Sequence, residues 1–106
     1  MGLFDFFKKQ NINEGVNAFR KENRAMLIDV REPGEYKQGH IPGSRNIPLA
    51  RINNAKSAIH DMNMPIYVYC QTGSRSSRAA SALKKMGYTN VTNIGGIEGF
   101  FGKLEH

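Results

Sequence analysis

The sequence predicts a single α/β domain with a mainly parallel central β-sheet and helices on both faces. Short β-branched or apolar runs alternate with segments of helical spacing along the chain, which is typical of parallel sheets. The length of 106 residues suits one domain, and 40% hydrophobic residues are normal for a folded protein. A chain of this size buries ~60–65% of its unfolded surface, so we expect one modest core.

The first half of the chain contains the weaker structural signals. Apolar residues recur at helical spacing after Asn13, which we expect to be an N-cap. The run AMLIDV is apolar and bounded by polar residues, which indicates a buried strand. Pro and Gly then favour a loop with at most one helical turn, followed by a short strand weakened by a proline. In order, the expected helix, strand, loop, strand and helix span residues 13–22, 25–30, 31–43, 45–49 and 50–62.

The second half contains the strongest strand, loop and helix unit. The β-branched and aromatic run PIYVY over residues 65–69 predicts a strand that ends at Cys70. A loop over residues 71–74 follows, and apolar residues then recur at helical spacing until Gly87 provides a stop. We expect a further strand over residues 91–94, then a Gly-Gly pair and a short terminal helix.

The two ends are expected to lie outside the domain proper, which spans residues 11–103. Residues 1–10 form a short amphipathic tail, whose Phe side chains we expect to pack onto the domain rather than to bind a membrane or a partner. Residues 104–106 resemble the start of a vector-encoded affinity tag. No signal peptide is predicted, so the expected compartment is the reducing cytoplasm, where a lone thiol survives.

The net charge of +6, from 15 basic and 9 acidic residues, excludes few functions by itself. The basic residues are scattered along the chain, so we expect a field that attracts small anions rather than a nucleic-acid site. No apolar run approaches the ~20 residues that cross a bilayer, so no membrane span is predicted. A single Cys forms no internal disulfide, and no Cys/His spacing predicts a metal site.

Cys70 is the candidate nucleophile, because it stands where a strand ends and the next helix begins. Ligands of open α/β sheets bind outside the carboxyl ends of the strands, and a helix N-terminus favours a thiolate. Gly73 permits a tight loop with inward N–H groups, and Arg75 adds a charge that can grip an oxyanion. A buried, inert thiol is the less favoured alternative for such a polar loop. Further hydroxyl donors are Thr72, Ser74 and Ser76.

The length of this loop bears on the reaction. Four residues separate Cys70 from Arg75, namely Gln71, Thr72, Gly73 and Ser74. In the phosphatase pattern the loop is one residue longer and wraps a tetrahedral phosphoryl group. The shorter loop favours transfer of a terminal sulfur atom, and a phosphatase or arsenate reductase stays open as an alternative.

Three stretches resemble signatures of the single-domain rhodaneses, the thiosulfate sulfurtransferase family, over about residues 11–102. They are similar to the N-terminal signature, the active-site loop and the C-terminal signature, in matching order and spacing. The stretches are LIDVRE, EY and GHIPGS within residues 27–44, CQTGSRS at residues 70–76, and VTNIGGI at residues 91–97 followed by Phe100.

The resemblance implies a rhodanese-type sulfurtransferase with a ping-pong mechanism. Cys70 would take the outer sulfur of a small anionic donor, such as thiosulfate or a polysulfide, and hold it as a persulfide. A thiol or cyanide would then accept that sulfur. N–H groups from Gln71 to Ser76 would stabilise the charged forms, and Arg75 would hold the donor's oxyanion. The resemblance implies no metal and no organic cofactor.

Three further residues are expected to support the site. Asp29 and Arg31 match family positions that mainly hold loops together by ion pairing. His40 matches a turn position where the resemblance implies a structural hydrogen bond rather than a catalytic base. Gln71 stands where many thiosulfate-using members have a basic residue. Together with the Phe-rich start, it leaves a second hypothesis open, a sulfur-carrier or regulatory module that works only with a protein partner.

Overall fold

The computed structural model describes residues 11–106 and contains a four-stranded, fully parallel sheet. The predicted α/β class is therefore confirmed. The tail expected over residues 1–10 lies outside the described residues. The strands are β1 (Met26–Asp29), β2 (Ser44–Asn46), β3 (Ile66–Cys70) and β4 (Val91–Gly96), in the order β2-β1-β3-β4.

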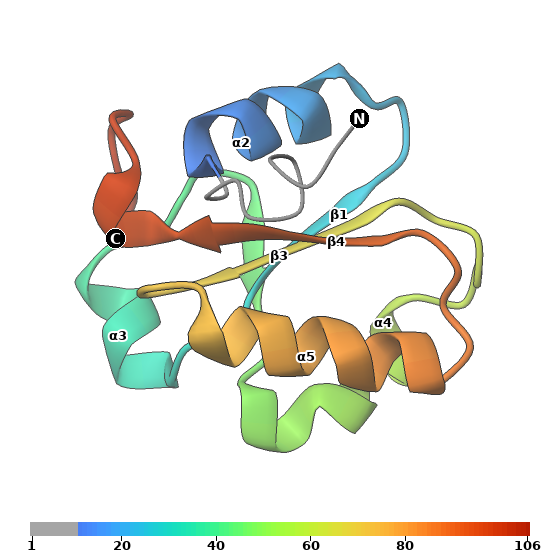
Figure 1. Cartoon of the computed structure of the whole chain (residues 1–106). Coiled ribbons are helices and arrows are strands. Elements are labelled where there is room, and N and C mark those ends of the chain that lie inside the picture. Colours follow the sequence, from blue (N-terminus) through green and yellow to red (C-terminus); the bar gives the residue numbers. More distant parts are fainter. Residues whose placement is uncertain (1–10) are drawn as a thin grey trace, which may run out of the picture.

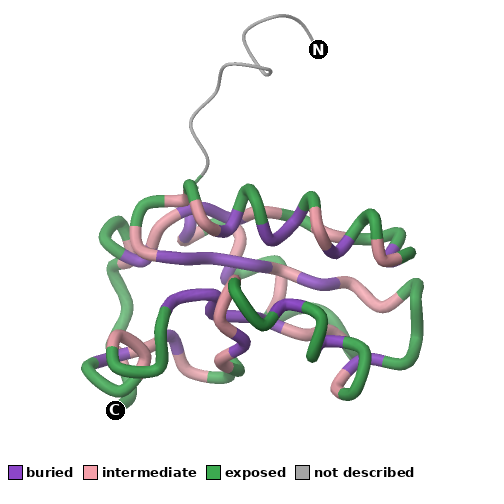
Figure 2. The backbone as a smooth tube through the Cα atoms, turned by 90° about the horizontal axis from the view of Figure 1, so that it is seen from below, coloured by how far each residue is buried: buried purple, intermediate pink, exposed green. Residues whose placement is uncertain are grey.

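Helices cover both faces of the sheet (Figure 1). One face carries α2 (Ile12–Lys21), and the other carries α5 (Ser74–Lys85), η1 (Leu49–Asn54) and α4 (Ala55–Ala58). Buried residues concentrate in the central strands, and buried and exposed residues alternate along the helices (Figure 2). Each of these four helices thus buries apolar residues on the side that faces the sheet. Within residues 11–106, no helix is long and apolar enough to cross a bilayer.

The apolar residues form two clusters rather than the single core expected from the chain length. The larger cluster includes Ile28, Val68 and Leu83, on the side of α5. The smaller includes Val16 and Leu27, on the side of α2. Successive side chains of a strand point to opposite faces, as Leu27 and Ile28 do. The expectation of one core was therefore wrong because the sheet itself separates two apolar layers.

The N-cap of α2 is Asn11 rather than the predicted Asn13. The Oδ1 atom of Asn11 accepts hydrogen bonds from the amides of Asn13 at 3.0 Å and Glu14 at 3.5 Å. The side chain of Asn13 instead donates to the carbonyl of Gly99 and accepts from the amide of Phe101. This tertiary contact, which joins residues far apart in the sequence, accounts for the difference.

Two predicted segments have different secondary structure. The loop expected over residues 31–43 contains a longer helix, α3 (Pro33–Gln38), which starts with proline. Its first turn is closed by Glu35, whose Oε1 accepts from the amide of Glu32 at 2.9 Å. The helix expected over residues 50–62 is shorter and is divided into η1 and α4, with non-helical backbone at Arg51.

The carboxyl ends of β1, β3 and β4 meet beside α3 at one end of the domain, on the left in Figure 1. The short helix η2 (Ile97–Gly99) follows β4 at this end. The C-terminal residues also lie here, because Glu105 pairs through its backbone with His40. An origin of residues 104–106 in a tag stays a prediction. Cys70 thus lies where three strand ends and the start of α5 converge.

Two helical glycines predict opposite effects of the same substitution on stability. Alanine is favoured over glycine within a helix by roughly 0.5–1 kcal/mol. A Cβ at Gly34 meets nothing within 4 Å, so Gly34→Ala should raise the free energy of unfolding by about that amount. A Cβ at Gly15 would overlap Ile94 on β4, so Gly15→Ala should lower it by about 1–3 kcal/mol. Urea denaturation measures both changes. Equal effects in the two variants would contradict the close packing of α2 on β4.

Candidate active site

The loop after β3 surrounds the sulfur atom of Cys70. Gly73 has a φ of +107°, a conformation that favours glycine, and it turns the chain into the first residue of α5. The amides of Gly73 and Ser76 donate to Sγ at 3.0 and 3.3 Å. The Ser76 hydroxyl lies 3.4 Å from Sγ. The tight loop that the sequence predicted is therefore present, with two of its amides directed at the sulfur.

These contacts determine the acidity of the thiol. Burial raises the pKa of Cys70, because a charged sulfur loses water. Hydrogen bonds from the Ser76 hydroxyl and from the amides of Ser76, Gly73 and Thr72 act in the opposite direction. Their combined effect holds the pKa of Cys70 below its ordinary value. The loop thus stabilises the thiolate, which is the nucleophilic form of cysteine.

Cys70 is completely buried, which corrects the expectation that a polar loop would leave the thiol accessible. Cys70 belongs to the larger apolar cluster. Its Sγ lies under the loop because the amides of Gly73 and Ser76 turn back toward it. Burial here does not make the thiol inert, since polar groups surround the sulfur. A reagent reaches Sγ only when the groups that cover it move.

Asn93 on β4 supports the loop, although it was not among the site residues predicted from the sequence. Its Oδ1 accepts from the Ser76 hydroxyl at 2.7 Å and from the amide of Gly95 at 3.0 Å. Its Nδ2 donates to the carbonyl of Gly73 at 3.3 Å. Asparagine is uncommon inside strands. Its presence in a predicted strand, shortly before the Gly-Gly pair, is the sequence feature by which Asn93 could have been selected. Asn93 therefore connects β4 to the two residues whose amides contact Sγ.

The Gly95-Gly96 pair at the end of β4 lies against the loop. A Cβ at Gly96 would overlap the carbonyl oxygen of Gln71 and the backbone of Thr72. The amide of Glu98 donates to that same carbonyl at 3.3 Å. Only a residue without a side chain allows the end of β4 to approach the loop this closely.

Asp29 and Arg31 form the buried ion pair that the resemblance implied. Arg31 Nη2 lies 2.7 Å from Asp29 Oδ2, and both side chains are almost fully buried. Burial lowers the pKa of Arg31, but the hydrogen bonds and charge of Asp29 outweigh it and hold the pKa above its ordinary value. Arg31 also donates to the Gly39 carbonyl at 2.7 Å and to Gln71 Oε1 at 3.3 Å. The pair thus joins the end of β1, the end of α3 and the loop.

Arg75 contacts a residue that sequence reasoning did not assign to the site. Its Nη1 and Nη2 atoms donate to Oε1 and Oε2 of Glu35 at 2.7 and 3.0 Å. The two side chains are 31% and 34% exposed. The hydrogen bonds from Arg75 lower the pKa of Glu35 to about 2. Forty positions separate the two residues in the sequence, so only the fold reveals the pair.

The side chains of the remaining predicted residues lie near the site and make no hydrogen bond to the sulfur. His40 Nδ1 lies 2.9 Å from the Tyr36 carbonyl, and the ring stacks on Tyr36 at 3.7 Å between centroids. Thr72 and Ser74 are exposed on the loop. Within residues 11–106, no three His, Cys, Asp or Glu side chains are grouped so that they could hold a metal ion.

The hydrogen bonds to Sγ predict the pH dependence of alkylation. In wild type, the rate of reaction with iodoacetamide should rise with a midpoint below the ordinary thiol pKa of ~8.5. Ser76→Ala removes the hydroxyl beside Sγ, whose contact lowers the pKa of Cys70, so the midpoint should rise by about one pH unit. Ser77→Ala, an exposed neighbour on α5, is the matched control and should leave it unchanged. A wild-type midpoint at the ordinary value would contradict the stabilisation.

Residues 11–103 match the family described as the Rhodanese-like domain. Uncharacterized protein YqhL of Bacillus subtilis is 47% identical over 83 residues, which cover 77% of the chain and 65% of YqhL. Thiosulfate sulfurtransferase PspE of Escherichia coli is 43% identical over 72 residues, 67% of the chain and 69% of PspE. Putative sulfur carrier protein YrkF of Bacillus subtilis is 39% identical over 106 residues, 99% of the chain and 52% of YrkF.

Among solved structures, a rhodanese with anions from Escherichia coli is similar to this chain, with a TM-score of 0.72 and 38% identity. The similarity covers 76% of this chain and 96% of that structure. The resemblance drawn from the three sequence stretches is thereby confirmed. By sequence and by structure, the chain belongs to the rhodanese-like domain family of sulfurtransferases.

Proposed function

We propose that this protein transfers sulfane sulfur through a persulfide on Cys70. It would receive the sulfur from a small anionic donor and pass it to a thiol or to cyanide. The observation that carries the proposal is the set of polar groups around Sγ, namely two amides that donate to it and the Ser76 hydroxyl 3.4 Å away. They favour a thiolate, and they suit a sulfur atom that gains and loses negative charge during the reaction.

The proposed reaction has two steps. The Cys70 thiolate attacks the sulfane sulfur of the donor, so that a new S–S bond forms and the donor's bond to that sulfur breaks. The electron pair of the broken bond leaves with the donor's remaining group. An acceptor thiolate or cyanide then attacks the outer sulfur of the persulfide and restores the Cys70 thiolate. No external oxidant or reductant is needed, because the sulfane sulfur keeps its oxidation state as it passes from one nucleophile to the next.

A second candidate function is favoured by one observation, the complete burial of Cys70. A thiol that small donors do not reach would serve in a sulfur carrier or regulatory module that a partner protein opens. The similarity to YrkF, a putative sulfur carrier protein, agrees with this alternative. The chain spans about half of YrkF, so the role of that whole protein is carried over only as a hypothesis.

The proposed function predicts a mass change after incubation with thiosulfate. Intact mass spectrometry should show wild type gaining one sulfur atom, and cyanide should remove that sulfur as thiocyanate. Cys70→Ser is the control and should gain nothing, since it lacks the carrier sulfur. If wild type gains no sulfur from thiosulfate, polysulfide or mercaptopyruvate, the small-molecule reaction is wrong and the partner-dependent module is favoured.

A further inference from the structure

We propose that Glu35 determines the donor charge that the site accepts, by holding Arg75 in an ion pair. The preferred donors would then be sulfane compounds with a single negative charge, such as an organic persulfide R–S–S⁻ or thiosulfonate R–SO₂–S⁻. Thiosulfate, which carries two charges, would be a weaker donor. This inference rests on the proposed sulfur transfer through Cys70.

The geometry of the pair leaves Arg75 little capacity for a donor. Both terminal nitrogens of its guanidinium donate to the two carboxylate oxygens of Glu35, the bidentate arrangement in which such pairs are strongest. Glu35 is itself held in place, because its Oε1 accepts from the amide of Glu32 at the start of α3. The low pKa of Glu35 keeps the carboxylate charged at every pH at which an enzyme assay is run. A donor oxyanion must therefore compete with a charged, anchored carboxylate.

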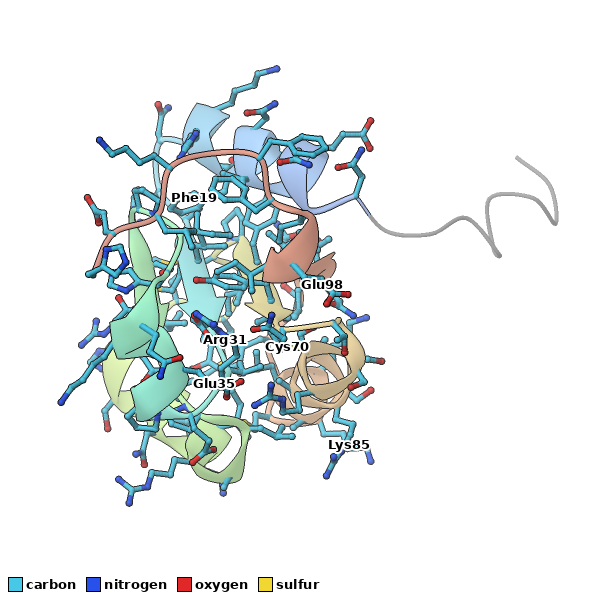
Figure 3. All side chains as sticks on the ribbon, turned by 90° about the vertical axis from the view of Figure 1, so that its left-hand side faces the viewer. Phe19, Arg31, Glu35, Cys70, Lys85 and Glu98 are labelled. Carbon is cyan, nitrogen blue, oxygen red and sulfur yellow. The ribbon has the colours of Figure 1, made fainter. Side chains whose placement is uncertain are left out.

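The second guanidinium beside the loop is also neutralised. Arg31 is paired with Asp29, and its remaining terminal nitrogen donates to Gln71. In Figure 3, Glu35 and Glu98 lie on either side of Arg31 and Cys70. Both carboxylates line the same cleft of about 310 Å³. The guanidiniums of Arg31 and Arg75 are thus accompanied by the carboxylates of Asp29, Glu35 and Glu98, in addition to the thiolate of Cys70.

Charge conservation shows why this arrangement selects among donors. When the Cys70 thiolate attacks a monoanionic donor ⁻S–X, an S–S bond forms, the S–X bond breaks, and X leaves as a thiolate or sulfinate with one negative charge. Two negative charges are then present at the site throughout. With thiosulfate the leaving group is sulfite, and three negative charges are present. The additional charge requires a free cation beside the loop, and both Arg31 and Arg75 are paired.

The test uses two donors that differ by one charge, thiosulfate and the methanethiosulfonate anion, in which a methyl group replaces one charged oxygen. Intact mass spectrometry of quenched samples gives the half-saturating donor concentration and the maximal rate at which Cys70 is loaded. Glu35→Gln keeps the acceptor for the Glu32 amide but frees Arg75. For thiosulfate, the half-saturating concentration should fall about five- to tenfold. This change corresponds to the lower end of the strength of a charge-assisted hydrogen bond, because Arg75 is partly exposed to solvent. The maximal rate of loading by thiosulfate should change less than about twofold. For methanethiosulfonate, the half-saturating concentration and the maximal rate should both change less than about twofold.

Three further variants separate charge selection from other effects. Glu98→Gln removes a cleft carboxylate without freeing a guanidinium, so its effect on thiosulfate should be at most about twofold. Arg75→Gln leaves Glu35 charged and unpaired, and should lower thiosulfate loading relative to methanethiosulfonate. Because loss of a donor-binding arginine would have the same effect, Glu35→Ala is the second variant that frees Arg75, and it should lower the half-saturating thiosulfate concentration as Glu35→Gln does.

The outcomes distinguish this inference from the proposed function. Equal acceleration of both donors in Glu35→Gln would show that the pair only restricts access to Cys70, and would overturn charge selection. Unchanged or weaker loading by thiosulfate in that variant would also overturn it. If neither donor loads Cys70 in wild type or in any variant, the proposed sulfur transfer from small donors fails instead.

Discussion

The hydrogen bonds from the Gly73 and Ser76 amides to Sγ of Cys70 constrain the end of β3, the loop, the start of α5 and the end of β4. They require a positive φ at Gly73, and they require β4 to approach the loop without a side chain at Gly96. Asn93 reinforces the same arrangement from β4. The strand, the loop and the first turn of α5 thus hold a single sulfur atom in a defined place.

Charge around this sulfur is arranged in pairs rather than as an open basic pocket. Arg31 is buried against Asp29, and the partly exposed Arg75 is bound to Glu35. The amides and the Ser76 hydroxyl therefore remain as the main stabilisers of the thiolate. Backbone amides carry no net charge, so they stabilise one negative charge without attracting several. The excess of basic residues over the whole chain attracts anions from a distance. At the site itself, the paired charges determine the local electrostatics.

The sequence was informative where the signals were local. The alternation of strands and helices, the strand that ends at Cys70 and the glycine that closes the loop all follow from neighbouring residues, and the structure contains each of them. Local signals also misled in places. Asn13 has the chemistry of an N-cap, but Asn11 occupies that position because Asn13 bonds to Gly99 and Phe101.

By itself, the sequence determined the α/β class, the family and the residue types that surround the thiol, because these depend on periodicity and on contiguous motifs. Only the tertiary structure decided that Cys70 is buried, that Asn93 supports Ser76 and that Arg75 is paired with Glu35. Those features join residues from different elements. Their distances depend on how α3, α5 and β4 pack at one end of the sheet, and spacing along the chain does not contain that information.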